Sequence, residues 1–140
     1  MMSGFAYALV CPAAYLAAGG LKFVLNSIKA RRLAFDKIGL GGMPSTHSAI
    51  ASAPGWLIAL IDGINNPAFA VAVGVLLIVA LDALDLRRKL EKVHHILKAN
   101  IMDDPDVGRL RDRVGHRPSE VVAGIATGAA AAVAVKWILI

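Results

Sequence analysis

Residues 68–81 read AFAVAVGVLLIVAL, a run without a single charged or hydrogen-bonding side chain. A helix needs about 20 mostly apolar residues to cross a bilayer core of about 30 Å. This run, continued toward Asp82 and Asp85, predicts a membrane-spanning helix. Similar runs predict three more spans: Met1–Ile28, a helix from about Ser45 to Ile61, and Val121–Ile140. We therefore expect an all-α integral membrane bundle of about four transmembrane helices, formed by one domain over residues 1–140.

Composition supports this class and excludes others. The chain is 57% hydrophobic, its mean hydropathy is +0.64 and its net charge is +5. A soluble nucleic-acid-binding protein is basic but lacks long uncharged runs, so we expect no nucleic acid as a partner. Cys11 is the single cysteine, so neither a disulfide framework within the chain nor a cysteine metal cluster is expected.

The charges predict an orientation. All but one of the 15 Lys and Arg residues fall near the end of the first span or in the loops after the first and third spans; the exception is Lys136. The positive-inside rule then places both loops in the cytoplasm and both termini outside. We assign the protein to a bacterial cytoplasmic membrane. The amphipathic segment Leu86–Lys98 predicts an additional helix along the cytoplasmic headgroups. Gly124 and Gly128 form a G-x-x-x-G pair that favours helix packing within the chain.

The first segment with chemical potential is Gly41–Ala49, with the sequence GGMPSTHSA. Glycines such as Gly42 allow N–H groups to approach an anion closely, and Ser45 or Thr46 can cap the helix that follows. The free N–H groups at that helix start favour a phosphate, and His47 in the first turn can donate a proton to a leaving oxygen. The alternative is a plain loop-to-helix cap with an interfacial histidine.

The second segment contains His116 and Glu120, four residues apart in GHRPSEVVAG. On one side of a turn they can bond each other, and a carboxylate on one imidazole nitrogen makes the other nitrogen more nucleophilic. In the alternative, Glu120 caps the fourth helix and His116 is an ordinary loop residue.

Cationic residues near these segments are candidates for phosphate binding. Arg87 and Arg88 have guanidinium groups that suit a phosphoryl group in transit, although arginines also anchor membrane boundaries. Lys22 can either reach the headgroups or point into the bundle at a phosphate. Asp82 and Asp85 can pair with the neighbouring arginines, the arrangement we prefer, or hold Mg²⁺ against a diphosphate.

Together, Pro44-Ser45-Thr46-His47 and His116-x-x-x-Glu120 resemble two motifs of the type-2 phosphatidic acid phosphatase and vanadium haloperoxidase superfamily. The longer strings from Gly41, from Asp82 and from Gly115 look like its small divergent branch. The resemblance extends from Lys22 to Gly124.

The resemblance implies a phosphohistidine mechanism that needs no metal or other cofactor. His116 is then the nucleophile, Glu120 orients it, and His47 protonates the leaving oxygen and later activates water. Lys22, Arg87 or Arg88, and the amides near Ser45 would stabilise the phosphoryl oxygens. The chain departs from the superfamily pattern at Leu110, where an arginine precedes the histidine by six residues in the superfamily, and in its four rather than six spans.

From these features we predict a metal-independent phosphatase that acts on a lipid phosphate or diphosphate at the cytoplasmic face, with the bilayer and a membrane lipid as its partners. The alternative from another class is a non-catalytic lipid-phosphate binding protein or transporter with the same basic pocket. A metal-dependent phosphotransferase built on Asp82 and Asp85 is a third hypothesis for the function. A homodimer is a separate hypothesis, because four thin helices bury little surface.

Overall fold

The computed structural model describes residues 2–33, 42–101, 104–110 and 114–140, and all regular structure in these ranges is helical. In chain order the helices are α1 (Met2–Ala30), α2 (Thr46–Ile61), α3 (Pro67–Leu81), α4 (Arg87–Asn100), α5 (Pro105–Gly108) and α6 (Pro118–Leu139). A π-helical segment, Asp82–Leu86, connects α3 to α4.

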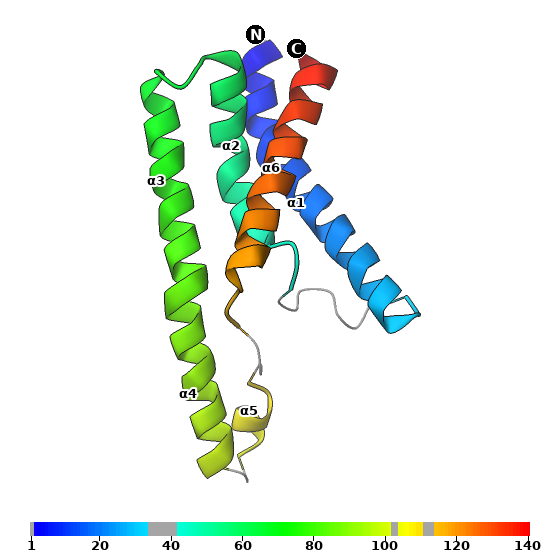
Figure 1. Ribbon diagram of the computed structural model, residues 1–140, viewed down its shortest axis with the longest axis vertical. Helices are drawn as coiled ribbons and strands as arrows, with labels where there is room; N and C mark the ends of the chain where they lie inside the picture. The colour runs from blue at the N-terminus through cyan, green and yellow to red at the C-terminus, as the bar shows by residue number, and fades with distance from the viewer. Residues whose placement is uncertain (1, 34–41, 102–103, 111–113) are drawn as a thin grey trace.

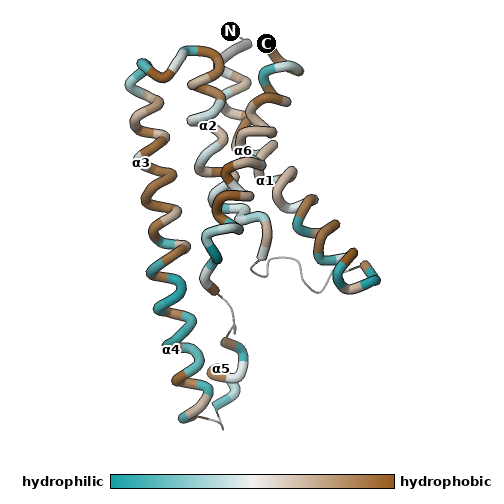
Figure 2. The backbone as a smooth tube through the Cα atoms, viewed as in Figure 1, coloured by the Kyte–Doolittle hydropathy of each residue, from teal (hydrophilic) through white to brown (hydrophobic). Residues whose placement is uncertain are grey.

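The predicted membrane bundle is confirmed within the described residues. Three helical stretches are long and apolar enough to cross a membrane, Gly4–Ala30, Pro67–Asn100 and Pro118–Leu139, and α2 is a shorter apolar helix. Figure 2 shows the apolar colouring along α3 giving way to polar residues along α4. The chain is therefore an all-helical integral membrane protein.

Helix α2 is the centre of the bundle, because it packs against α1, α3 and α6, while α1 also packs against α6. The buried core between α1, α2 and α6 is made mostly of small side chains: Ala6, Val10, Ala14, Ala53, Leu57, Ala131, Ala132 and Val135. In lipid, helices associate through close van der Waals packing rather than by escaping water, and small residues allow that close approach.

The pair Gly124 and Gly128 lies against α2, as the sequence predicts. A Cβ at Gly128 would lie 2.6 Å from the carbonyl oxygen of Ala49, and a Cβ at Gly124 would lie 2.9 Å from Cβ of Ser48. Both distances are too short for real atoms. The two glycines therefore let the backbones of α2 and α6 touch, and they serve packing within the chain.

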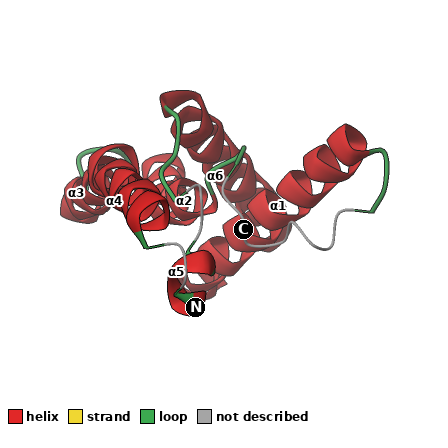
Figure 3. Cartoon of the chain, turned by 90° about the horizontal axis from the view of Figure 1, so that it is seen from below, coloured by secondary structure: helices red, strands yellow, loops and turns green. Residues whose placement is uncertain are grey.

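One predicted element differs from the structure. The segment Leu86–Lys98 does not form a separate helix along the headgroups, because α4 continues α3 through the π-helical segment as one stretch from Pro67 to Asn100. Figures 1 and 3 show α3 and α4 as a single rod. The backbone hydrogen bonds run on through the π-helical turn, in which the N–H of Arg87 donates to the carbonyl of Asp82, so nothing breaks the helix there.

The two ends of the bundle differ in character. Both termini and the turn between α2 and α3 lie at one end, whereas the basic end of α1 and the charged helix α4 lie toward the other (Figure 1). At the terminal end, the hydroxyl of Tyr7 bonds the carboxylate of Asp62, and Nζ of Lys136 donates to the carbonyl of Leu60 at 3.0 Å. This arrangement agrees with the pairing of loops and termini expected from charge; which end faces the cytoplasm remains a prediction.

Helix α3 contributes no buried residue to the bundle. Many of its apolar side chains are exposed, among them Val71 and Ile78. Such a surface suits lipid as well as a second copy of the chain, and the homodimer stays a prediction.

The packing of α6 on α2 gives a test with a matched control. We expect Gly128→Ala to lower the free energy of unfolding by about 1–3 kcal/mol, because the new methyl group overpacks a contact that cannot move apart. Gly74→Ala on α3 is the control, since a Cβ there meets nothing within 4 Å. Thermal unfolding in detergent, followed by circular dichroism, measures both variants; equal midpoints would contradict the backbone contact.

Candidate functional site

The segment before α2 directs His47 toward the end of the bundle that carries the charged segments. Gly42 has a φ of +129°, a conformation that favours glycine, and the Met43–Pro44 peptide bond is cis. Ser45 is the N-cap of α2, and its hydroxyl accepts the N–H of Ser48 at 3.3 Å. His47 follows in the first turn, where its side chain is exposed. Thr46 begins the helix, so the free N–H groups predicted at a helix start lie beside His47.

Ser45 connects the two predicted motifs directly. Its backbone N–H donates to the carbonyl oxygen of Glu120 at 2.9 Å, and the whole residue is buried. Its hydroxyl also accepts a hydrogen bond from the hydroxyl of Ser48 at 2.9 Å. Because these groups already have protein partners, the geometry gives Ser45 the role of holding α2 to α6. Thr46 and Gly42 are then the candidates for phosphate contacts near this helix start, and those contacts stay a prediction.

His116 lies in the short segment before α6 and is held there by the α3–α4 rod. Its backbone N–H donates to the carbonyl oxygen of Ala83, within the π-helical segment, at 3.1 Å. The carboxylate of Glu91 on α4 accepts the N–H groups of Val114 and Gly115 at 3.2 and 3.0 Å. A Cβ at Gly115 would lie 3.1 Å from Cα of Arg88, so this position can approach α4 closely only as glycine.

The imidazole of His116 is buried, with 6% of the residue exposed. Neither ring nitrogen has a hydrogen-bond partner among the described residues. A buried polar atom without a partner costs roughly 1–3 kcal/mol, and such groups in native structures often serve a function. The ring is therefore placed to receive a polar ligand.

The hydrogen bond expected between His116 and Glu120 is not formed. Pro118 begins α6, so Glu120 is the third helical residue, and its Oε2 accepts the backbone N–H of Arg117 at 3.0 Å. This capping bond draws the carboxylate toward the helix end. Glu120 nevertheless lies close enough to His116 to influence its charge.

Electrostatic effects on His116 show which predicted residues gather around it. Burial lowers the pKa of its imidazole below the usual 6.5, the negative charge of Glu120 opposes this shift, and Lys22, His47 and Arg87 add to it. The imidazole is consequently neutral at neutral pH. Lys22 comes from α1, His47 from α2 and Arg87 from the start of α4, so three helices converge on the segment that carries His116.

The remaining charged candidates are Arg87, Arg88 and the two aspartates of the Mg²⁺ hypothesis. Arg87 forms an ion pair with Asp82 at 2.5 Å, as preferred from the sequence, whereas Asp85 pairs with Lys89 at 2.8 Å rather than with an arginine. Arg88 is exposed and packs its stem against Gly115. Within the described residues no group of three or more His, Cys, Asp or Glu side chains gathers, and each aspartate of the Mg²⁺ hypothesis already holds a cation.

Sequence reasoning missed the residues that hold His116 in place. Glu91 lies among the charges of α4, where nothing in the local pattern distinguishes it from a solvated carboxylate. The carbonyl of Ala83 lies in a π-helical turn, which has no sequence signature here. Both partners act through the backbone of residues 114–116, and backbone hydrogen bonds between distant segments leave no mark on residue type.

The role of Glu91 can be tested independently of catalysis. We expect Glu91→Ala to speed amide hydrogen exchange in the peptide that contains Val114–His116, since two backbone N–H groups lose a charged acceptor. Lys92→Ala, a neighbouring exposed position, is the control. Exchange mass spectrometry of the detergent-solubilised protein measures both, and unchanged exchange in Glu91→Ala would contradict the anchoring role.

Comparison with known proteins identifies the family of this chain. The chain is 28% identical to the uncharacterized membrane protein YuiD of Bacillus subtilis (strain 168), in an alignment that covers 83% of this chain and 84% of that protein. No solved structure matches the chain. A family model described as the divergent PAP2 family matches residues 5–131, a range that contains both histidine motifs and the cationic residues around them. The chain therefore belongs to the divergent PAP2 family.

Proposed function

We propose that this protein is a metal-independent membrane phosphatase that hydrolyses a lipid phosphate or diphosphate through a phosphohistidine on His116. The observation that carries the proposal is the buried imidazole of His116, whose two nitrogens have no hydrogen-bond partner among the described residues. Lys22, His47 and Arg87 lie near enough to influence its charge. Membership of the divergent PAP2 family supports the same reaction class.

In the first step, a ring nitrogen of neutral His116 attacks phosphorus, and the bond between phosphorus and the lipid oxygen breaks. Protonated His47 donates its proton to that leaving oxygen, which releases the lipid alcohol or lipid monophosphate. A bound phosphate favours the protonated form of His47 because opposite charges attract. Lys22 and Arg87 stabilise the charge that spreads over the phosphoryl oxygens.

In the second step, neutral His47 takes a proton from water, and the water oxygen attacks phosphorus. The bond between phosphorus and nitrogen breaks, inorganic phosphate leaves, and both histidines return to their starting states. The carboxylate of Glu120 stabilises the positive imidazole ring of the intermediate through its charge rather than through a direct hydrogen bond. Its pull on the pKa of His116 supports this role.

The length of α2 supports a lipid as the substrate. Helix α2 has 16 residues, which span about 24 Å, less than the roughly 30 Å of a bilayer core. When its Asp62 end lies at one membrane interface, the His47 end lies within the border of the opposite leaflet. A phosphate at that depth is most readily supplied by a lipid whose tail stays in the membrane.

The non-catalytic carrier remains the second candidate, favoured by one observation. His116 lacks the hydrogen bond that would fix its tautomer, because Glu120 bonds Arg117 instead. A site that only binds phosphate needs no activated nitrogen.

Phosphate release distinguishes the two candidates. Purified protein in lipid vesicles is given phosphatidic acid, phosphatidylglycerophosphate and farnesyl diphosphate, with EDTA present throughout. We expect release that survives EDTA and falls by at least about 10³-fold in His116→Ala and in His47→Ala, because each variant lacks an essential group of the two-step reaction. Lys98→Ala on the outer part of α4 is the control. No release by folded native protein from any of these lipids would reject the phosphatase in favour of the carrier.

The acidic limb of the pH profile tests the state of His116. Protonation removes the attacking lone pair, so kcat/KM is expected to fall as pH drops through the pKa of this imidazole. Since burial places that pKa below 6.5, the loss should begin only below about pH 6.5. Profiles of kcat/KM between pH 4.5 and 8 measure it; an acidic limb with a midpoint above 6.5 would contradict a buried neutral nucleophile.

A further inference from the structure

The charges closest to His116 balance one another. Arg87 forms its ion pair with Asp82 at 2.5 Å, and Lys22 interacts electrostatically with Glu120. Two cations thus face two carboxylates, and this inner group has no net charge while His116 and His47 are both neutral. Protonation of His47 adds one positive charge, so a phosphate dianion that binds there still brings more negative charge than the inner group can neutralise.

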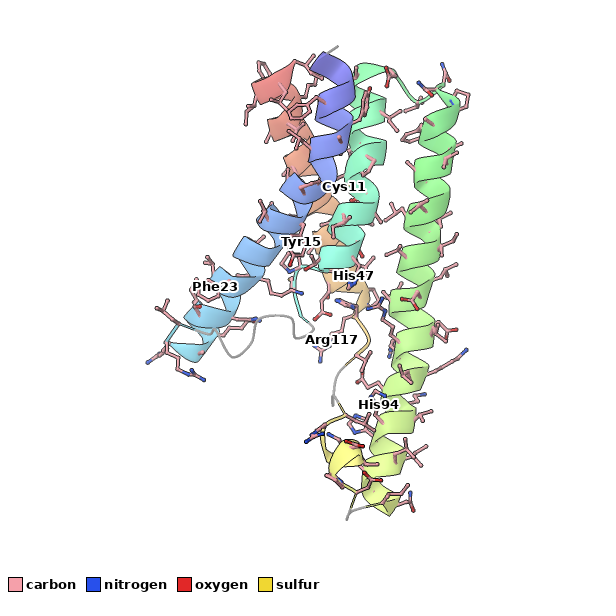
Figure 4. All side chains as sticks on the ribbon, turned by 180° about the vertical axis from the view of Figure 1, so that it is seen from behind. Cys11, Tyr15, Phe23, His47, His94 and Arg117 are labelled. Carbon is pink, nitrogen blue, oxygen red and sulfur yellow. The ribbon has the colours of Figure 1, made fainter. Side chains whose placement is uncertain are left out.

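Arg117 is a cation at the same helix start as Glu120, and no predicted role includes it. It follows His116 in the chain and is the N-cap of α6, and its backbone N–H is fixed by the bond to Glu120 at 3.0 Å. Its side chain is exposed, and no ion pair to its guanidinium occurs within the described residues. Figure 4 shows Arg117 below His47, between α1 and the α3–α4 rod.

The two neighbouring side chains differ in a way that suits a ligand with two anionic groups. His116 is buried with unpartnered nitrogens, whereas Arg117 is exposed at the same helix start. The exposed guanidinium of Arg117 is therefore open to a second anionic group of a ligand whose terminal phosphate reaches His116. A guanidinium binds phosphate oxygens through two parallel hydrogen bonds, and so recognises a phosphate by shape as well as by charge.

We propose that Arg117 binds a second phosphate group of the substrate, so that this site prefers lipids with two phosphates, a terminal one that is cleaved and an inner one that remains on the lipid. The inference rests on the proposed function, which supplies the cleaved phosphate at His116. Two kinds of lipid carry this chemistry: a prenyl diphosphate, in which the phosphates are directly joined, and a phospholipid whose headgroup ends in a phosphate monoester.

The experiment compares two matched substrate pairs in phosphatidylcholine vesicles. One pair is phosphatidylglycerophosphate and phosphatidic acid with the same acyl chains; the other is farnesyl diphosphate and farnesyl monophosphate. We expect Arg117→Gln to lower kcat/KM for the two-phosphate member of one pair about tenfold more than for its single-phosphate partner, since a charged hydrogen-bonded pair is lost. The pair that responds identifies the kind of lipid. Arg117→Lys should recover part of the preference, because it keeps the charge and loses the fork.

The control is Arg31→Gln, which removes one positive charge just after the C-terminal end of α1. This variant should leave the preference for the two-phosphate lipid unchanged in both substrate pairs. An unaltered preference in both pairs for Arg117→Gln would overturn the proposal. The proposal would also be overturned if Arg117→Gln lowered kcat/KM equally for both members of each pair, and if the size of that loss changed when anionic phosphatidylglycerol was added to the vesicles. Arg117 would then bind membrane headgroups.

Binding separates this inference from the proposed function. In a His116→Ala background, where turnover is blocked, Arg117→Gln should weaken binding of the two-phosphate member about tenfold relative to its partner. That result would support the second phosphate contact even if the native protein released no phosphate. Equal weakening of both members in folded protein, judged by an unchanged circular dichroism spectrum, would overturn it.

Discussion

The hydrogen bond from the backbone N–H of Ser45 to the carbonyl of Glu120 holds the candidate site together. It joins the first residue before α2 to the first turn of α6, and these two helix starts carry the two histidine segments. Gly124, one turn further along α6, allows the backbones to approach closely enough for this bond, because a side chain there would strike Ser48. In a membrane, where an unpaired backbone group is expensive, such a bond is also strongly favoured.

The α3–α4 rod supplies the second constraint. Without it, the segment from Val114 to His116 would be a free loop next to α6. The carbonyl of Ala83 and the carboxylate of Glu91 instead take three consecutive backbone N–H groups of that segment. The same rod carries Arg87 at the junction of its π-helical and α-helical parts. A continuous helix therefore positions both a phosphate-binding candidate and the candidate nucleophile, which a separate helix along the headgroups would not do.

Much of the fold follows from the sequence because a bilayer imposes simple rules. Uncharged runs of sufficient length predict helices, and the glycine pair in α6 predicts a close helix contact, which the structure confirms against α2. The prediction that Leu86–Lys98 forms a separate helix along the headgroups differs from the structure, in which one helical stretch runs from Pro67 to Asn100, since an amphipathic pattern describes a helix with two unlike faces and says nothing about its direction. The gathering of Lys22, His47 and Arg87 around His116 agrees with the motifs, whereas their roles in catalysis stay predictions.

The spacing of residues along the chain does not predict the hydrogen bonds of the site, because one side chain can bond any of several competing partners. The four-residue spacing of His116 and Glu120 permits a mutual bond, yet Pro118 begins the helix between them and makes Glu120 the capping residue. Capping satisfies an N–H group at the helix start and leaves the imidazole without a partner. The protein thus accepts roughly 1–3 kcal/mol for each unpaired buried nitrogen. A phosphate oxygen that accepts a hydrogen bond from the N–H of the neutral ring regains part of that free energy on binding, so the same feature that weakens the empty site strengthens its hold on a ligand.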